Sequence, residues 1–141
     1  MSVYCGTDII EVARIKKSMQ KSIFKVSIYT DFEIEDIDKA SNEDIRYQRY
    51  AGRFAAKEAV YKALSPLCKR EDYMPSFKDI EIANDESLGG RPFVRPLCDK
   101  MIELFSKYEI KLDLSISHVK ETAIAICVAT VEKEWMEDGR K

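Results

Sequence analysis

The alternation of apolar and polar residues predicts strands near both ends of the chain. One short strand is expected over residues 3–8, and two more over 112–130, joined in a hairpin around 117–120. Two further strands are expected at 77–83 and 91–94, separated by a turn-rich loop. Because the last two strands are joined by a short turn, they must be antiparallel.

Helical spacing fills the regions between these strands. Three shorter helices are expected. The first follows Asp8 directly, the second begins at a capping box formed by Thr30 and Glu33, and the third covers residues 97–108. We find no internal repeat and no linker. The pattern therefore predicts an α+β fold: a single small domain, residues 1–131, with an antiparallel sheet packed against helices on one face, and a charged tail, 132–141.

The longest helix is expected in the middle of the chain. A capping box of Ser41 and Asp44 predicts its start. Its end is expected within a residue or two of Leu64, because Pro66 lacks the amide hydrogen that a helix interior requires.

This central helix carries a carboxylate, Glu58, at a position where the helical spacing predicts an apolar residue. At about 100° per residue, Glu58 falls inside an apolar stripe. The stripe consists of Tyr47, Ala51, Phe54, Ala55 and Tyr61, and the opposite face, expected to be solvated, carries Arg46, Arg49, Arg53 and Lys57. A surface pair with Lys62 is one explanation, but such a pair contributes only ~0.2–0.5 kcal/mol. A buried carboxylate needs a stronger partner, such as a metal ion.

Two other residues are candidates for chemistry. Asp8 ends the first predicted strand and shares a face with Gly6, which leaves room for a close approach; the alternative is that Asp8 only caps the next helix. His118, the only histidine, lies at the turn of the final hairpin, where it is either a ligand-binding or a purely structural residue.

Composition restricts the class of protein. The 141 residues are 45% hydrophobic and 34% charged with a net charge of −2, and no apolar run is long enough to cross a membrane. The four cysteines, Cys5, Cys68, Cys98 and Cys127, have no metal-binding spacing. We expect a cytoplasmic protein with reduced thiols, no signal peptide and no nucleic-acid partner.

Three segments in this order resemble the holo-acyl-carrier-protein synthases, a small trimeric type of 4'-phosphopantetheinyl transferase. They are GTDII at the N-terminus, RFAAKEAVYKAL in the central helix and LSISH before the last strand. The most specific match is FxxKExxxK, formed by Phe54, Lys57, Glu58 and Lys62. The resemblance implies Mg²⁺-dependent transfer of the phosphopantetheine arm of coenzyme A to a serine of apo acyl carrier protein, in fatty acid biosynthesis.

The resemblance also implies roles for individual residues. Asp8 and Glu58 would bind Mg²⁺ and, with Lys62, form the catalytic group. Coenzyme A would be bound by Arg53, Lys62, Arg91, Pro92 and His118. The base for the serine proton would be Glu58 or a metal-bound water, and the sequence leaves both open.

The helix after Asp8 is expected to dock the acidic carrier protein. Arg14, Lys17 and Lys21 share one stripe at helical spacing, although an ordinary solvated face would look similar. The family forms homotrimers with active sites at subunit boundaries, so Glu58 could meet its own Asp8 or a neighbour's. The segment 65–68 departs from the family's glycine-rich loop, and a non-catalytic relative that binds coenzyme A or a carrier protein is the alternative function.

Overall fold

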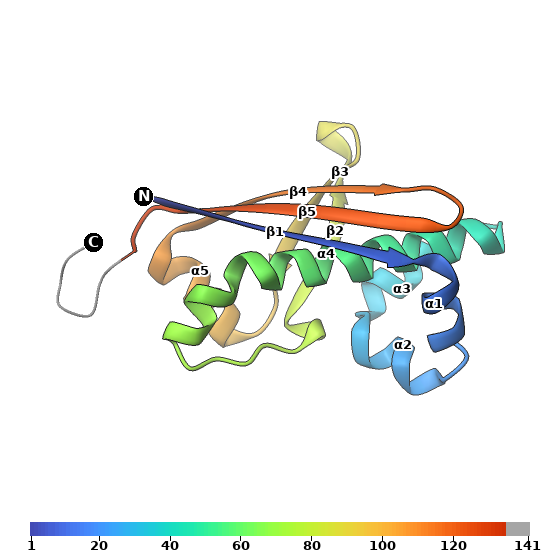
Figure 1. Cartoon of the computed structure of the whole chain (residues 1–141), viewed down its shortest axis with the longest axis horizontal. Helices are drawn as coiled ribbons and strands as arrows, with labels where there is room; N and C mark the ends of the chain where they lie inside the picture. Colours follow the sequence, from blue (N-terminus) through green and yellow to red (C-terminus); the bar gives the residue numbers. More distant parts are fainter. Residues whose placement is uncertain (135–141) are drawn as a thin grey trace.

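The longest helix, α4 (Glu43–Arg70), lies against a three-stranded sheet in the computed structural model, which describes residues 1–134 (Figure 1). The sheet has the order β1 (Ser2–Glu11), β5 (Thr122–Val131) and β4 (Ile110–His118), and both pairs are antiparallel. This arrangement confirms the predicted α+β fold with a long helix on an antiparallel sheet. It also places β1 and β4 at opposite edges.

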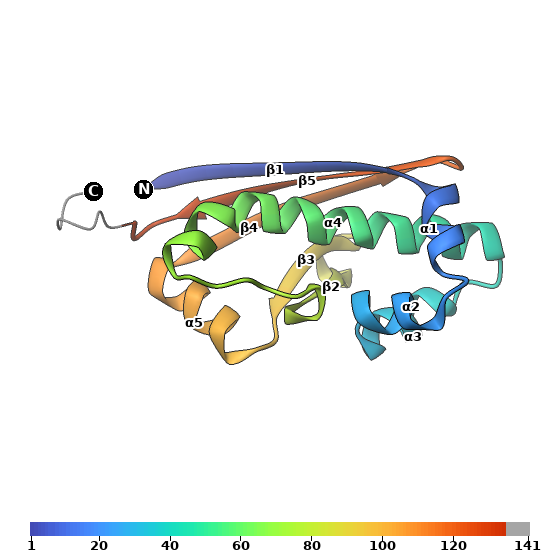
Figure 2. The ribbon, with the colours of Figure 1, turned by 60° about the horizontal axis from the view of Figure 1, so that its bottom comes forward.

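Smaller elements cover α4 on the side away from the sheet (Figure 2). They form two groups: α1, α2 and α3 near one end of the helix, and a two-stranded hairpin with α5 further along it. Their bounds are α1 (Val12–Ser18), α2 (Ser22–Ile28), α3 (Asp31–Asp38), η1 (Phe77–Asp79), β2 (Ile80–Asp85), η2 (Glu86–Leu88), β3 (Arg91–Pro96) and α5 (Asp99–Tyr108). The long helix is thus an inner layer with neighbours on two sides.

Burial on two sides overturns the predicted division of α4 into an apolar and a solvated face. Arg53 and Lys57, predicted to face solvent, are buried. Glu58 is only half-buried. Two neighbouring rows of α4 are fully buried: Ala51, Ala55, Ala59 and Ala63 form one, and Ala56, Val60 and Leu64 form the other. A single-stripe pattern assumes a helix with one covered face, and that assumption fails for an inner helix.

The predicted end of the central helix is also wrong, because α4 continues through Pro66 to Arg70. A proline at this position leaves the carbonyl of Lys62, four residues earlier, without its usual amide donor. The hydroxyl of Ser65 donates to that carbonyl at 3.0 Å. A side chain one residue before the proline therefore supplies the missing hydrogen bond.

Other predicted boundaries differ less. The capping box at the start of α3 is confirmed: Thr30 Oγ1 accepts from the Glu33 amide, and Glu33 Oε1 accepts from the Thr30 amide. The cap of α4 is Asn42, which accepts from the Ile45 amide, rather than a box at Ser41. The strand expected from residue 77 begins at Ile80, after the short helix η1.

The segment after β5 is attached to the domain as far as it is described. Glu134 is buried, lies 3.0 Å from Arg70 and accepts a hydrogen bond from Tyr4. The remainder of the predicted charged tail, 135–141, lies outside the described residues. All four cysteines are free thiols. Over residues 1–134, no helix has the length and apolar character of a membrane span.

Strand β1 touches the backbone of α4 at Gly6, and this contact yields a prediction. A Cβ at residue 6 would lie 2.1 Å from the Ala59 carbonyl oxygen and 2.7 Å from the Ala63 amide nitrogen. Gly6→Ala must push strand and helix apart, so we expect a loss of unfolding free energy on the order of 3 kcal/mol. Urea denaturation would measure it. Cys5→Ala, on the exposed face of the same strand, is the control; equal stability of both variants would contradict the contact.

Candidate active site

Asp8 extends from β1 toward α4, two residues beyond the Gly6 contact. Its Oδ1 lies 3.2 Å from Nζ of Lys62, which also donates to the Thr7 carbonyl at 2.9 Å. Asp8 does not cap the following helix, since α1 begins at Val12 and no side chain caps it. The helix-cap alternative is therefore wrong, and Asp8 is free to face α4.

Glu58 lies one helical turn before Lys62 and near Asp8 of the same chain. Burial raises the pKa of the Glu58 carboxyl, the negative charge of Asp8 raises it further, and the positive charge of Lys62 lowers it. Two carboxylates that repel one another beside one ammonium form a site that favours an added cation. Glu58 and Asp8 of the same chain thus lie close enough for their charges to interact.

The donor set fits Mg²⁺. Only two carboxylates meet here, and among residues 1–134 no group of three or more metal-binding side chains occurs. Mg²⁺ typically takes one or two carboxylates and fills its octahedron with waters and substrate phosphate oxygens. Asp8 and Glu58 are the residues that would hold such an ion.

A largely apolar cavity of about 600 Å³ opens beside Glu58. Tyr61, Ser65 and Cys68 of α4 line one wall. The other wall is formed by Tyr73, Met74, Pro75 and Phe77. Ser65 and Cys68 reach this cavity because α4 continues past Pro66. The segment whose sequence departs from the expected glycine-rich loop therefore forms part of the wall of this cavity.

A second hollow, of about 480 Å³, gathers the other predicted coenzyme-binding residues. His118, Arg53 and Pro92 all line it, together with Gly90. Nδ1 of His118 lies 2.8 Å from Oε1 of Gln48. Burial lowers the pKa of His118, and the nearby charge of Arg49 lowers it further, so the imidazole is neutral at pH 7.

Two of these predicted residues have partners of their own. Arg53 donates to Asp36 at 2.7 Å and to the Glu33 carbonyl at 3.3 Å, although it still borders the hollow. Arg91 is not among the lining residues; its side chain pairs with Asp113 on β4. Arg91 therefore needs to leave Asp113 before it can contact a ligand in this hollow.

The two groups of candidate residues lie at opposite edges of the sheet. Asp8 is on β1 and His118 is on β4, and β5 separates these strands. Glu58 and Lys62 accompany Asp8, whereas Arg53 and Pro92 accompany His118. The candidate residues of one chain thus form two separate groups.

Sequence reasoning missed several residues around the second hollow. They are Phe32, Asp36, Arg49, Gly52, Asn84 and Glu86. Gly52 had a detectable signal, because a glycine in the middle of a long helix often marks a close contact. A Cβ there would lie 3.1 Å from Ile116 and 3.9 Å from His118, so Gly52 lets β4 approach the helix.

The predicted carrier-docking residues are exposed but do not share one helix. Arg14 and Lys17 belong to α1, which ends at Ser18, and Lys21 immediately precedes α2. The single extended helix predicted after Asp8 is therefore wrong. A turn redirects the chain, yet the three cations remain on exposed positions of neighbouring segments.

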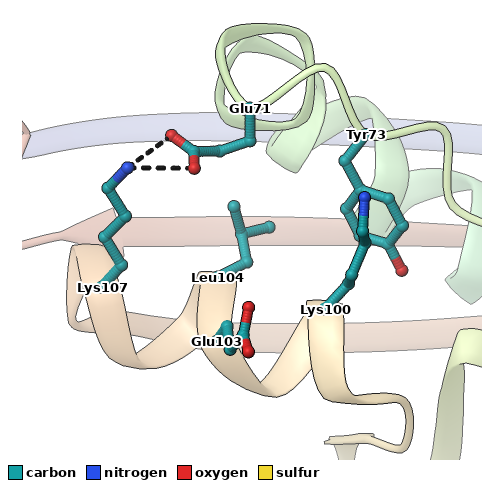
Figure 3. Close-up of a pocket in the computed structure, with 6 residues that line it drawn as sticks. All are labelled: Glu71, Tyr73, Lys100, Glu103, Leu104 and Lys107. Carbon is teal, nitrogen blue, oxygen red and sulfur yellow. Dashed lines mark hydrogen bonds and ion pairs between the residues drawn. The ribbon is translucent and has the colours of Figure 1, made fainter.

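A smaller hollow of about 220 Å³ between the end of α4 and α5 holds none of the candidate residues (Figure 3). Lys107 points toward Glu71 and pairs with it at 2.8 Å, while Lys100 lies over the ring of Tyr73. Both ammonium groups already have partners. We therefore interpret this hollow as structural.

The opposing effects on Glu58 give a prediction for the metal-free protein. Lys62→Met removes a positive charge, so the pKa of Glu58 should rise; Asp8→Asn removes a negative charge, so it should fall. Carboxyl ¹³C NMR titration in the presence of a chelator would measure both. Shifts in the same direction for the two variants would show that the three charges do not share a site.

Comparison with known proteins places the chain among relatives of similar length. Residues 4–127 match the model of the 4'-phosphopantetheinyl transferase superfamily. The chain is 42% identical to the holo-[acyl-carrier-protein] synthase of Clostridium kluyveri, covering 91% of this chain and 90% of that protein. It is 37% identical to the one from Fusobacterium nucleatum, covering 91% and 98%.

A solved structure agrees with these matches. The holo-(acyl-carrier-protein) synthase of Bacillus anthracis, in complex with CoA (3',5'-ADP), superposes with a TM-score of 0.67 at 33% identity, covering 89% of this chain and 94% of that one. Fold, sequence and length all agree with one family. The chain belongs to the 4'-phosphopantetheinyl transferase superfamily, among the holo-[acyl-carrier-protein] synthases.

Proposed function

We propose that this chain transfers the 4'-phosphopantetheine arm of coenzyme A to a serine of apo acyl carrier protein, as part of fatty acid biosynthesis. The products are holo carrier protein and adenosine 3',5'-bisphosphate. The observation that carries the proposal is the group of Asp8, Glu58 and Lys62 beside an apolar cavity, in a chain of this family. Phosphoryl transfer depends on charge neutralisation of this kind.

Each residue of the group has a role in the reaction. The serine oxygen forms a bond to the phosphorus that bears pantetheine, and the bridging bond to the bisphosphate breaks. Mg²⁺ held by Asp8 and Glu58 would neutralise the pyrophosphate oxygens. Lys62 supplies a point charge to the same phosphates. The acceptor of the serine proton is Glu58 or a water molecule beside it.

The two hollows match the two ends of coenzyme A. The pantetheine arm leaves the pyrophosphate next to Glu58, where the cavity walls are mainly apolar. The nucleotide end carries a 3'-phosphate and suits the hollow with Arg49, Arg53 and His118. His118 is bound through Nδ1 to Gln48, which leaves Nε2 for a hydrogen bond to the cofactor.

A homotrimer would bring these partial sites together across subunit boundaries. In one chain they occupy opposite edges of the sheet, at β1 and β4. The sheet face away from α4 also exposes several large apolar side chains, namely Val3, Ile9, Ile124 and Ile126. Contiguous apolar surface of this kind marks association, and a cyclic arrangement joins one edge to the other edge of a neighbour.

The carrier protein is proposed to dock on α1 and α2. Arg14, Lys17 and Lys21 are exposed there, and Ile23 and Val26 on α2 are 67% and 51% exposed. Cations around exposed apolar residues suit an acidic protein partner. The four free thiols agree with a reducing, cytoplasmic location, which we also propose.

The first experiment measures transfer directly. With apo carrier protein, coenzyme A and Mg²⁺, the carrier should gain the mass of one phosphopantetheine. Asp8→Asn and Glu58→Gln should each lower kcat/KM at least about 100-fold, the scale for removing one electrostatic stabiliser, without changing Tm. Glu35→Gln, an exposed carboxylate on α3, is the control. Binding of coenzyme A without any mass gain would instead support the non-catalytic alternative.

Sites shared between subunits predict complementation. A Glu58→Gln chain has an intact nucleotide hollow, and an Arg49→Glu/His118→Ala chain has an intact metal group. Dissociating and reassociating an equal mixture should restore activity, since roughly a quarter of the interfaces would pair two intact halves. Activity no greater than the average of the two parents would show that each chain works alone.

Docking through cations predicts a dependence on ionic strength. The carrier association rate should fall as salt rises, because the Debye length is about 10 Å at 0.1 M. Lys17→Glu should lower this rate at low salt, whereas Lys39→Glu, an exposed lysine after α3, should not. Stopped-flow fluorescence with labelled carrier would measure both. A rate independent of salt would rule out the proposed docking surface.

A further inference from the structure

Lys57, the residue before Glu58, is fully buried and is not used by the proposed reaction. Its ammonium nitrogen lies within 3.2 Å of four oxygen atoms on four different elements or their ends. They are the carbonyls of Ile28 at 2.8 Å, Phe77 at 2.8 Å and Ile80 at 3.2 Å, and Oε1 of Glu33 at 2.8 Å. A buried ammonium is unfavourable unless every proton has an acceptor, and here every proton has one.

One of these carbonyls, that of Phe77, belongs to the wall of the cavity beside Glu58, and a second, that of Ile80, follows three residues later. Phe77 lines that cavity, and its ring stacks on Phe54 of α4 with centroids 5.5 Å apart. Lys57 binds the backbone of this same residue and of Ile80, three residues later. The ammonium therefore sets the separation between the cavity wall and the helix that carries Glu58.

The rest of the wall, before Phe77, is attached to α4 by other contacts. Between the end of α4 and η1, residues 71–76 form no regular helix or strand. Two other hydrogen bonds join the wall to α4: the Tyr73 amide donates to the Cys68 carbonyl at 2.8 Å, and the Tyr61 hydroxyl donates to the Ser76 carbonyl. Both hold the part of the wall that precedes Phe77. Lys57 adds two hydrogen bonds of the charge-assisted kind, which are the stronger ones.

Glu33 holds the other side of the ammonium. Its carboxylate accepts from the Thr30 amide at 2.8 Å and from the Ile82 amide at 2.7 Å, and it is itself fully buried. These bonds fix Glu33 between α3 and β2. Glu33 therefore holds the Lys57 ammonium in place independently of the cavity wall. The position of the ammonium is rigid as a result.

From these contacts we propose that Lys57 is a positioning residue for the pantetheine arm of coenzyme A. Its ammonium holds the Phe77–Ile80 backbone so that the cavity stays open beside Glu58. This inference rests on the proposed function, because it takes the cavity as the place of the arm. Without Lys57 the wall moves relative to α4, and the arm loses a preformed site.

Binding of two ligands distinguishes a positioning role of Lys57 from a purely stabilising one. Coenzyme A contains the arm, whereas adenosine 3',5'-bisphosphate lacks it and contacts only the nucleotide hollow. Lys57→Met/Glu33→Gln removes both buried charges together, which leaves no unpaired ion in the core. Calorimetry on the assembled protein should show coenzyme A binding weakened at least about tenfold and bisphosphate binding changed less than about twofold.

Tyr29→Phe is the matched control. It removes a buried hydrogen bond to α4, from the Tyr29 hydroxyl to the Tyr50 carbonyl at 2.8 Å, without touching the cavity wall. Its two affinities should keep their wild-type ratio. An equal loss of both ligands in the double variant, or no loss of either, would overturn the positioning role. A wild-type protein that bound neither ligand and transferred nothing would instead reject the proposed function.

A measurement on the wild-type protein tests the inference even where the variant does not fold. The Lys57 ammonium is enclosed by its acceptors, so its Nζ resonance can be followed by ¹H–¹⁵N NMR. Adding coenzyme A should shift this resonance, because the arm presses on the wall that Lys57 holds. Adding the bisphosphate should leave it in place. The same shift with both ligands, or a shift with neither, would contradict the proposal.

Discussion

The contact between strand β1 and helix α4 at Gly6 determines most of the candidate site. Only a residue without a side chain can lie there, since a Cβ would meet the Ala59 carbonyl oxygen at 2.1 Å. The close approach brings Asp8, two residues along the same face of the strand, to Lys62 and near Glu58. A strand held further from the helix would leave the two carboxylates unable to share a cation.

The charges on α4 are arranged in an unexpected way. Glu58 seemed misplaced because it fell in an apparent apolar stripe, yet it is only half-buried and borders a cavity. The buried charge is its neighbour Lys57, which is compensated by Glu33 and three carbonyls. Within FxxKExxxK, Lys57 therefore organises the core, whereas Glu58 and Lys62 face the candidate site.

The separation of the site into two groups follows from sheet topology. β5 lies between β1 and β4, so Asp8 and His118 lie on strands that are not neighbours in the sheet. Under the proposed function, the metal-binding group and the nucleotide hollow each form only part of the coenzyme A site. The proposed homotrimer would let a second copy supply the other part.

The sequence by itself determined the family, the α+β class, and the residue types of the candidate site. These features depend on local patterns: alternation in the strands, the Thr30–Glu33 capping box, and a carboxylate beside lysines at helical spacing. It did not determine which face of α4 is buried, because elements distant in sequence cover both sides. It also did not determine that α4 passes Pro66, since that depends on the Ser65 hydroxyl replacing the lost amide donor. The tertiary structure alone decided that Glu58 lies near Asp8 of its own chain and that His118 lies on the opposite edge strand, because strand order is set by pairing between segments more than 100 residues apart.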